Sequence, residues 1–131
     1  MVDAVQFEVE TTLGYGVGSV AKFATSGVAA NLIRGSTVHS SKRGLALPVG
    51  NRQFIELKGK TLKRLQKRYA GKLKLVILDE FSMLRQKELH WVDKRLKQIM
   101  GNNLPFGGVA IVLIGDPGQL PAILGLSLIH I

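Results

Sequence analysis

The chain has 131 residues, which corresponds to one domain or part of one. Hydrophobic residues make up 46% of it, so the composition supports a packed core and excludes an intrinsically disordered chain. The sequence contains no cysteine, which excludes disulfides and thiolate metal sites and is typical of an intracellular protein. A net charge of +9 predicts a polyanionic partner, with nucleic acid the first candidate and an anionic membrane surface the second.

The first 18 residues carry little pattern. Val5, Phe7 and Val9 alternate with polar residues, which predicts a half-exposed strand. Residues 14–18 hold glycines at alternate positions but lack the Lys-Ser/Thr pair of a phosphate-binding Walker A loop, so we expect an ordinary turn. No stretch of the sequence predicts a secretory signal or a transmembrane span.

A strand-to-helix junction follows. Residues 19–24 predict a short strand and residues 28–33 predict a helix, with Thr25, Ser26 and Gly27 between them. Free main-chain N–H groups at such a helix start can bind a phosphate. Thr and Ser are also ordinary helix caps, and the chemistry of these residues alone favours the cap.

Residues 35–43 are rich in hydroxyl groups and end in two cations. Side chains such as Thr37, His39 and Ser40 can contact a nucleic-acid backbone. A single His is more often structural, and no second His lies at metal-ligand spacing, so we predict no metal site here. Residues 44–51 predict a loop.

A strongly basic stretch spans residues 58–74 and holds eight of the 18 cations. Leu62, Leu65 and Tyr69 recur at helical spacing, so we expect an amphipathic helix over residues 61–70. Its basic face is either a DNA-facing surface or an ordinary solvated face, and the sequence leaves both interpretations open.

The most informative stretch is the apolar run at residues 75–78, which ends in Asp79 and Glu80. Such a run predicts a strand buried on both faces, and open α/β sheets bind ligands at the carboxyl ends of their strands. This is the Walker B pattern of P-loop ATPases, in which the first acid serves Mg²⁺ and the second polarises a water. From these residues alone, a core strand that ends in a solvated acidic turn is the alternative.

Leu89, Val92, Leu96 and Ile99 recur on one face of a predicted helix over residues 86–100, and a second apolar strand is predicted after it at residues 109–114. A strand-helix-strand unit makes its two strands parallel, so Glu80 and Gln119 are expected at the same edge of the sheet. Oxygen ligands for Mg²⁺, a base for the attacking water and an amide that senses the γ-phosphate together suit nucleotide hydrolysis.

Five motifs occur in the order found in one group of proteins. They are Thr25-Ser26-Gly27-Val28-Ala29-Ala30, Gly35-Ser36-Thr37-Val38-His39-Ser40, Leu78-Asp79-Glu80-Phe81-Ser82-Met83, Pro105-Phe106-Gly107-Gly108, and Gly115-Asp116 with Gln119-Leu120-Pro121. Over residues 19–123 the chain resembles the petite integration frequency (PIF-type) DNA helicases, relatives of RecD in helicase superfamily one. Five ordered motifs are far more specific than any one of them.

This resemblance implies a fold and a nucleotide site. The fold would be part of a RecA-like P-loop ATPase domain, an α/β fold with a mostly parallel sheet flanked by helices. The function would be that of an ATP-dependent 5′-to-3′ DNA helicase with ATP and Mg²⁺ as cofactors. The family pattern makes Asp79 an indirect partner of Mg²⁺, Glu80 the catalytic base and Gln119 the γ-phosphate sensor. Asp116 would join them in binding the nucleotide.

The resemblance also implies partners. The segments that would hold single-stranded DNA contribute Thr25, Ser26, Gly27, Thr37, His39 and Ser40. Phosphate and stacking contacts would bind single strands and duplex junctions with little sequence preference. The family further suggests DNA repair, recombination and telomere maintenance, in the nucleus or the mitochondrion and without a membrane partner.

Departures from the family limit the activity that we expect. No Walker A loop is found before residue 19, and the second RecA-like domain with its arginine fingers is missing. Residues 1–18 and 124–131 do not follow the family, and Ser26 and Ala122 replace a usual Thr and Pro. We therefore expect a fragment from a truncated or misassembled reading frame, with negligible ATPase activity alone. The alternatives are a non-catalytic basic module that binds single-stranded nucleic acid and a gene relic that does not fold.

Overall fold

The computed structural model describes residues 2–49, 52–79, 86–115 and 128–129. In this part of the chain the strands form one sheet in the order β2-β1-β3-β4-β5. The first four in that order run parallel, and the last is antiparallel to its neighbour. The strands are β1 (Val20–Ala24), β2 (Ser36–Thr37), β3 (Leu75–Asp79), β4 (Ala110–Ile114) and β5 (Leu128–Ile129).

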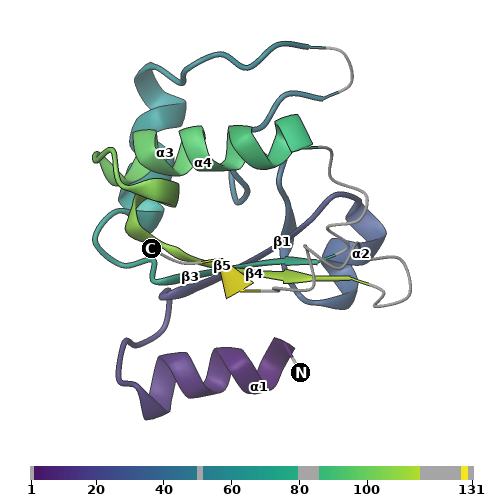
Figure 1. The fold of residues 1–131 in the computed structure, drawn as a ribbon, viewed down its shortest axis with the longest axis vertical. Helices are drawn as coiled ribbons and strands as arrows, with labels where there is room; N and C mark the ends of the chain where they lie inside the picture. Colours follow the sequence, from purple (N-terminus) through teal and green to yellow (C-terminus); the bar gives the residue numbers. More distant parts are fainter. Residues whose placement is uncertain (1, 50–51, 80–85, 116–127, 130–131) are drawn as a thin grey trace.

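Helices lie on both faces of the sheet (Figure 1). One face is covered by α3 and α4, and α1 lies across the other. The helices are α1 (Val2–Phe7) with a π-helical turn after it (Glu8–Thr12), α2 (Gly27–Leu32), α3 (Gly59–Tyr69), α4 (Gln86–Met100) and a 3₁₀ turn (Pro105–Gly108). Within the described ranges, no helix has the length and apolar character needed to cross a bilayer. The expected α/β architecture, a mostly parallel sheet between helices, is confirmed.

The main core lies between the sheet and the α3/α4 layer. Val76 and Leu78 of β3 and Ile111 and Leu113 of β4 are buried there, because alternate residues of a strand point to the same face. The helices contribute Leu65, Tyr69, Trp91, Val92, Leu96 and Ile99. Full burial of one such aliphatic side chain stabilises the fold by about 1.5–3 kcal/mol. The core therefore holds the carboxyl ends of β3 and β4 in fixed positions.

The strand-helix-strand unit expected from the sequence is present. Leu75 of β3 pairs with Ala110 of β4 in parallel register, and α4 connects the two strands with the bounds that its apolar periodicity predicts. Asp93 on α4 also binds the 3₁₀ turn that follows the helix, because its carboxylate accepts the N–H of Phe106 at 2.6 Å. The same carboxylate lies 3.0 Å from the ammonium of Lys97. These contacts fix the corner where the chain leaves α4 for β4.

The strand predicted near the N-terminus is wrong. Val5, Phe7 and Val9 lie on α1 and its π-helical turn, not on a strand. Val5 and Val9 are half-buried while Phe7 is 62% exposed, which is the four-residue period of a helix. Three apolar residues at alternate positions are compatible with the period of a strand and with that of a helix. A pattern this short does not distinguish the two. The turn expected at residues 14–18 is present.

Candidate nucleic-acid interface

The motif-bearing strands end together at one edge of the sheet. Ala24 pairs with Thr37, and Asp79 pairs with Ile114. Because Phe23 pairs with Leu78, the next residues along, Ala24 and Asp79, also lie beside each other. The row Thr37, Ala24, Asp79 and Ile114 therefore marks the carboxyl edge of the parallel strands. Ligands of open α/β sheets bind at this edge.

Asp79 is the part of the predicted nucleotide site that the structure describes. It is half-buried at the end of β3. Glu80, Asp116 and Gln119 lie outside the described residues, so their predicted roles remain predictions. Within the described ranges, no three His, Cys, Asp or Glu side chains gather as a metal site.

Ser26 caps α2, as the simpler interpretation of this junction predicted. The Ser26 Oγ accepts the Ala29 N–H at 3.2 Å, and its backbone is extended. Ala29 is buried against Ala24, which anchors the short helix to the end of β1. Thr25 is half-buried, whereas Ser26 is exposed. The motif thus presents polar groups and a helix start beside the carboxyl edge.

A groove separates α2 from the segment that follows β2. Its volume is about 540 Å³. It is lined by Gly27, Val28, Ala30, Asn31, Leu32, Gly35, Ser36, Thr37, Ser40 and Arg43. The groove brings together Gly27, Thr37 and Ser40, three of the predicted DNA-binding residues. Thr25, Ser26 and His39 do not line it, while Arg43, one of the two cations that end the hydroxyl-rich segment, does.

Two glycines permit the tight backbone around this groove. A Cβ on Gly35 would lie 2.2 Å from the Lys22 carbonyl oxygen, and a Cβ on Gly44 would lie 2.0 Å from that of Thr37. Real Cβ atoms do not approach so closely, so any larger residue would displace the chain. The role of these glycines could have been predicted from the sequence, because Gly35 begins the hydroxyl-rich segment and Gly44 directly follows it.

Ser40 and His39 shape the turn between these glycines. The Ser40 Oγ accepts the N–H groups of Lys42 and Arg43 at 3.3 and 3.2 Å, and the Ser40 carbonyl accepts that of Gly44 at 3.1 Å. Nδ1 of His39 lies 3.2 Å from the Leu47 carbonyl oxygen, so this nitrogen donates the hydrogen bond. His39 is therefore a structural residue here, with Nε2 the remaining polar atom.

Comparison with known proteins places this arrangement in a family. The model of the PIF1-like helicases matches residues 8–126. The chain belongs to the PIF1-like helicase family. It is 36% identical over 105 residues to ATP-dependent DNA helicase Pif1 of Psychrobacter sp. and 34% identical over 110 residues to ATP-dependent DNA helicase RRM3 of Saccharomyces cerevisiae.

The match covers most of this chain and a small part of the relatives. The two alignments cover 79% and 83% of the chain but only 16% and 15% of the relatives, about a sixth of their length. Bacteroides sp. Pif1 in complex with ADP-AlF4 superposes with a TM-score of 0.65 at 28% identity, over 93% of this chain and 27% of that one. Candida albicans Pif1 gives 0.64 at 26% identity, over 98% and 29%. The expected RecA-like helicase fold is confirmed.

Sequence reasoning missed a buried arginine that organises this PIF1-like chain. Arg95 of α4 is 1% exposed and donates hydrogen bonds to the carbonyls of Leu45, Ala46 and Ile55 at 2.8–3.1 Å. Its guanidinium also lies 4.5 Å from the ring centroid of Phe54. Burial lowers the pKa of Arg95 to about 10, with Glu56 opposing the shift, so the side chain stays charged at neutral pH.

Gln98 holds the same loop one turn further along α4. Its Nε2 donates to the Leu57 carbonyl at 2.7 Å, and its Oε1 accepts the Leu57 N–H at 3.1 Å. Oε1 also accepts from Arg95 at 2.9 Å. We call residues 38–47 the turn segment and residues 52–58 the clamped segment. The sequence held one signal for this clamp. Arg95 follows Trp91 by four positions, so it falls on the buried face of the helix, where a charged side chain needs partners.

The basic helix α3 connects to the groove through one residue. Leu65 and Tyr69 are buried as predicted, while the cations of residues 58–74 are exposed. The Tyr69 hydroxyl donates to the Arg43 carbonyl at 2.5 Å, so α3 supports the arginine that lines the groove. Burial raises the pKa of Tyr69 although Arg68 opposes the shift, which keeps this hydroxyl a donor at neutral pH.

Proposed function

We propose that this chain is the part of an ATP-dependent 5′-to-3′ DNA helicase motor that grips single-stranded DNA and carries the Walker B carboxylates. The observation that supports it best is the common carboxyl edge, where Thr37 of the groove and Asp79 of the Walker B strand lie in one row. A change at the nucleotide would act within two strands of the DNA-binding groove. Such proximity is what coupling of hydrolysis to DNA movement requires.

DNA would lie along the groove between α2 and the turn segment. The Thr37 and Ser40 side chains line it, and Arg43 adds an exposed cation beside them. Hydroxyl and guanidinium groups bind phosphates without reading base identity, so the site would hold single strands with little sequence preference. A Bacteroides Pif1 structure contains single-stranded DNA together with ADP-AlF3, and this chain superposes on it with a TM-score of 0.60 at 30% identity.

ATP would bind beside the end of β3. Mg²⁺, when bound with ATP, would neutralise charge on the phosphates, and Asp79 would hold it through water. Glu80 is proposed to accept a proton from the attacking water, and Gln119 to contact the γ-phosphate. Asp116 is proposed to complete the nucleotide contacts. Each of these roles requires its side chain at the carboxyl edge, which the described end of β3 supports only for Asp79.

The 131 residues alone are expected to hydrolyse ATP negligibly. No Walker A sequence is present to hold the triphosphate, and a missing arginine finger lowers the rate of related ATPases by about 10³–10⁵. The test is phosphate release with and without oligodeoxythymidine. Hydrolysis that the oligonucleotide stimulates and that Glu80→Gln abolishes would show that this chain is active by itself.

DNA binding tests the rest of the proposal. Fluorescence anisotropy of a labelled oligodeoxythymidine should show binding that falls steeply between about 50 and 200 mM salt, because phosphate contacts release counterions. Arg43→Ala should weaken binding at every salt concentration, whereas Lys63→Ala on the outer face of α3 should change it little. Equal loss in both variants would mean that binding is a general charge effect, and no binding at low salt would contradict the proposal.

The basic charge also favours a second candidate, a non-catalytic module that binds single-stranded nucleic acid. The two differ in their response to nucleotide. Oligonucleotide affinity that ATP and Mg²⁺ change supports the motor, and affinity that they leave unchanged supports the module. In the cell we propose that the complete helicase acts on duplex junctions in DNA repair, recombination and telomere maintenance, in the nucleus or mitochondrion.

A further inference from the structure

The outer edge of β1 is only partly covered. Of the described residues, β2 pairs with Phe23 and Ala24 alone, and Gly35 lies against the Lys22 carbonyl, so Val20 and Ala21 have no strand beside them on this side. Pairing stops because the chain turns at Arg34, whose φ is +56°, and at Gly35. A short edge strand therefore remains available next to the groove.

Main-chain groups of β1 point alternately toward β3 and toward this open edge. The Ser19 carbonyl accepts from Leu75 at the β3 side, whereas the Ala24 carbonyl accepts from Val38 at 3.0 Å on the open side. By the two-residue period of a strand, the groups of Val20 and Lys22 also face outward. Gly35 covers the Lys22 carbonyl, so the open groups are the N–H and carbonyl of Val20 and the N–H of Lys22. This edge thus presents both donors and acceptors in the spacing of a β-ladder.

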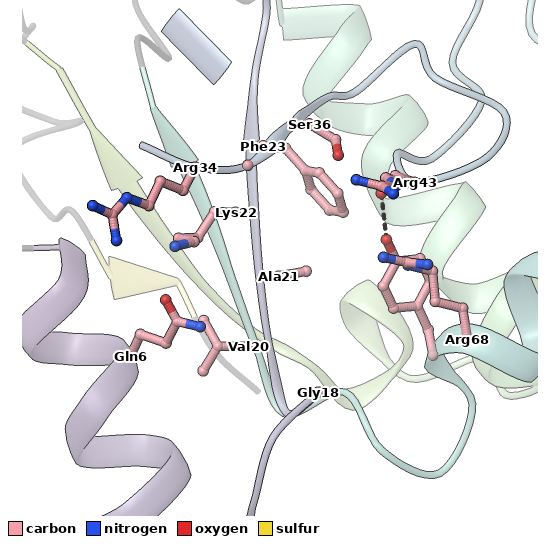
Figure 2. A pocket seen from close by; sticks show the side chains of 12 residues that line it. Gln6, Gly18, Val20, Ala21, Lys22, Phe23, Arg34, Ser36, Arg43 and Arg68 are labelled. Atoms are coloured by element: carbon pink, nitrogen blue, oxygen red, sulfur yellow. Dashed lines mark hydrogen bonds between the residues drawn. The ribbon is translucent and has the colours of Figure 1, made fainter. Parts of the chain in front are cut away.

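A cavity of about 320 Å³ runs along this edge and is flanked by four cations (Figure 2). Lys22 and Arg34 lie on the side of the strand that faces α1, and Arg43 and Arg68 lie on the opposite side. An acidic group of this chain already approaches one of them, since the Asp3 carboxylate lies 3.9 Å from the Lys22 ammonium. The cavity therefore combines an open backbone edge with positive charge on both faces.

We propose that the β1 edge is a docking site for an extended acidic segment of a partner protein, which adds a strand beside Val20 and the N–H of Lys22. Successive side chains of an added strand point to opposite faces. Acidic residues at two neighbouring positions would therefore meet Arg34 on one face and Arg68 on the other. Main-chain hydrogen bonds supply affinity in this mode of recognition, and the cations supply specificity for acidic sequence.

A polypeptide matches this edge better than a nucleic-acid strand does. A phosphodiester offers only acceptors, so it cannot satisfy the outward carbonyl of Val20, whereas a peptide supplies both N–H and C=O groups. The phosphates of a single nucleic-acid strand also lie along one line, whereas the cations of this cavity lie on both sides of β1. The site needs neither ATP nor DNA, so it can be tested separately from the helicase proposal.

The test uses the 131-residue protein and fluorescein-labelled octapeptides rich in valine and threonine. One peptide carries two adjacent central glutamates, a second carries glutamines there, and a third is the glutamate peptide N-methylated at alternate residues. Anisotropy should show binding of the first peptide and a roughly tenfold weaker affinity for each of the others. Arg34→Glu and Arg68→Glu should each weaken the first peptide roughly tenfold, while Lys63→Glu, an exposed cation on α3, should leave it unchanged.

Several results would overturn the proposal. Equal binding of the N-methylated peptide would mean simple charge attraction, and equal binding of the glutamine peptide would remove the acidic preference. Oligodeoxythymidine that binds and loses affinity in both glutamate variants, with no peptide binding, would make this edge a nucleic-acid surface. Trp91 fluorescence during thermal unfolding shows whether each variant is folded, and Arg34→Gln and Arg68→Gln replace any that is not.

Discussion

The turn segment and the clamped segment follow each other in the chain but depend on main-chain and side-chain contacts to different degrees. Main-chain bonds fix the turn segment, where the Val38 carbonyl accepts the N–H groups of both Leu45 and Leu47 at 3.1 Å. Side chains of α4 fix the clamped segment, through Arg95 and Gln98, and Arg95 also binds the Leu45 and Ala46 carbonyls at the end of the turn segment. A shape made by the main chain demands particular residues locally, whereas a shape made by a distant helix leaves the local sequence free.

Arg95→Met should have the largest effect on stability. It keeps the length of the side chain but leaves the carbonyls of Leu45, Ala46 and Ile55 without their donor, which should lower the free energy of unfolding by about 3–5 kcal/mol. Urea unfolding followed by Trp91 fluorescence measures this change. Lys63→Met is the control, and equal losses in the two variants would contradict the clamp.

Gly44→Ala should damage the turn segment. The new Cβ would collide with the Thr37 carbonyl, so we expect a loss of about 2–3 kcal/mol and weaker oligonucleotide binding. For stability, Gly27→Ala is the matched control, since nothing lies within 4 Å of a Cβ there. If Gly44→Ala lowers stability without affecting binding, the groove does not depend on the turn.

Gln98→Ala should loosen the clamped segment more than the turn segment. It removes both hydrogen bonds to Leu57 and should lower the free energy of unfolding by about 1–2 kcal/mol. Oligonucleotide affinity should stay unchanged, because Gln98 contacts no residue of the groove. A parallel loss of affinity would show that the two segments act as one unit.

Ser26→Ala should have the smallest effect. Loss of the cap on α2 should destabilise the protein by about 1 kcal/mol, and Ser26→Asp should retain the stability because aspartate caps equally well. Thermal unfolding compares the two variants. If both weaken oligonucleotide binding while only the alanine lowers stability, Ser26 contacts DNA as well as the helix.

The sequence predicted the elements whose signals are local, namely periodic helices, apolar strands and short motifs. Leu89, Val92, Leu96 and Ile99 gave the bounds of α4, and the apolar run before Asp79 gave β3 with its parallel neighbour. The ordered motifs gave the family. The helix and strand signals rest on residues a few positions apart, where periodicity and chain chemistry determine structure directly, and each of the ordered motifs is itself a short run.

The remaining features depend on contacts between distant parts of the chain. Arg95 binds carbonyls about fifty positions away, and no local sequence pattern predicts which main-chain carbonyls will accept its hydrogen bonds. His39 looked available for DNA, yet the carbonyl of Leu47 occupies its Nδ1. The first helix was missed because Val5, Phe7 and Val9 are too few to separate a two-residue period from a helical one. Glu80, Asp116 and Gln119 fall outside the described residues, so the nucleotide half of the site rests on the sequence.

The parallel register of β3 also determines the order in which this chain can fold. Leu75 pairs with Ala110 across a connection that contains α4, whereas it pairs with Val20 across the longer stretch that contains α2, β2 and α3. Closing the shorter loop loses less chain entropy, so β3, α4 and β4 should form the folding nucleus. Ile111→Val should then slow refolding, while Val20→Ala should mainly speed unfolding, in stopped-flow measurements of Trp91 fluorescence. The groove between α2 and the turn segment would therefore form last.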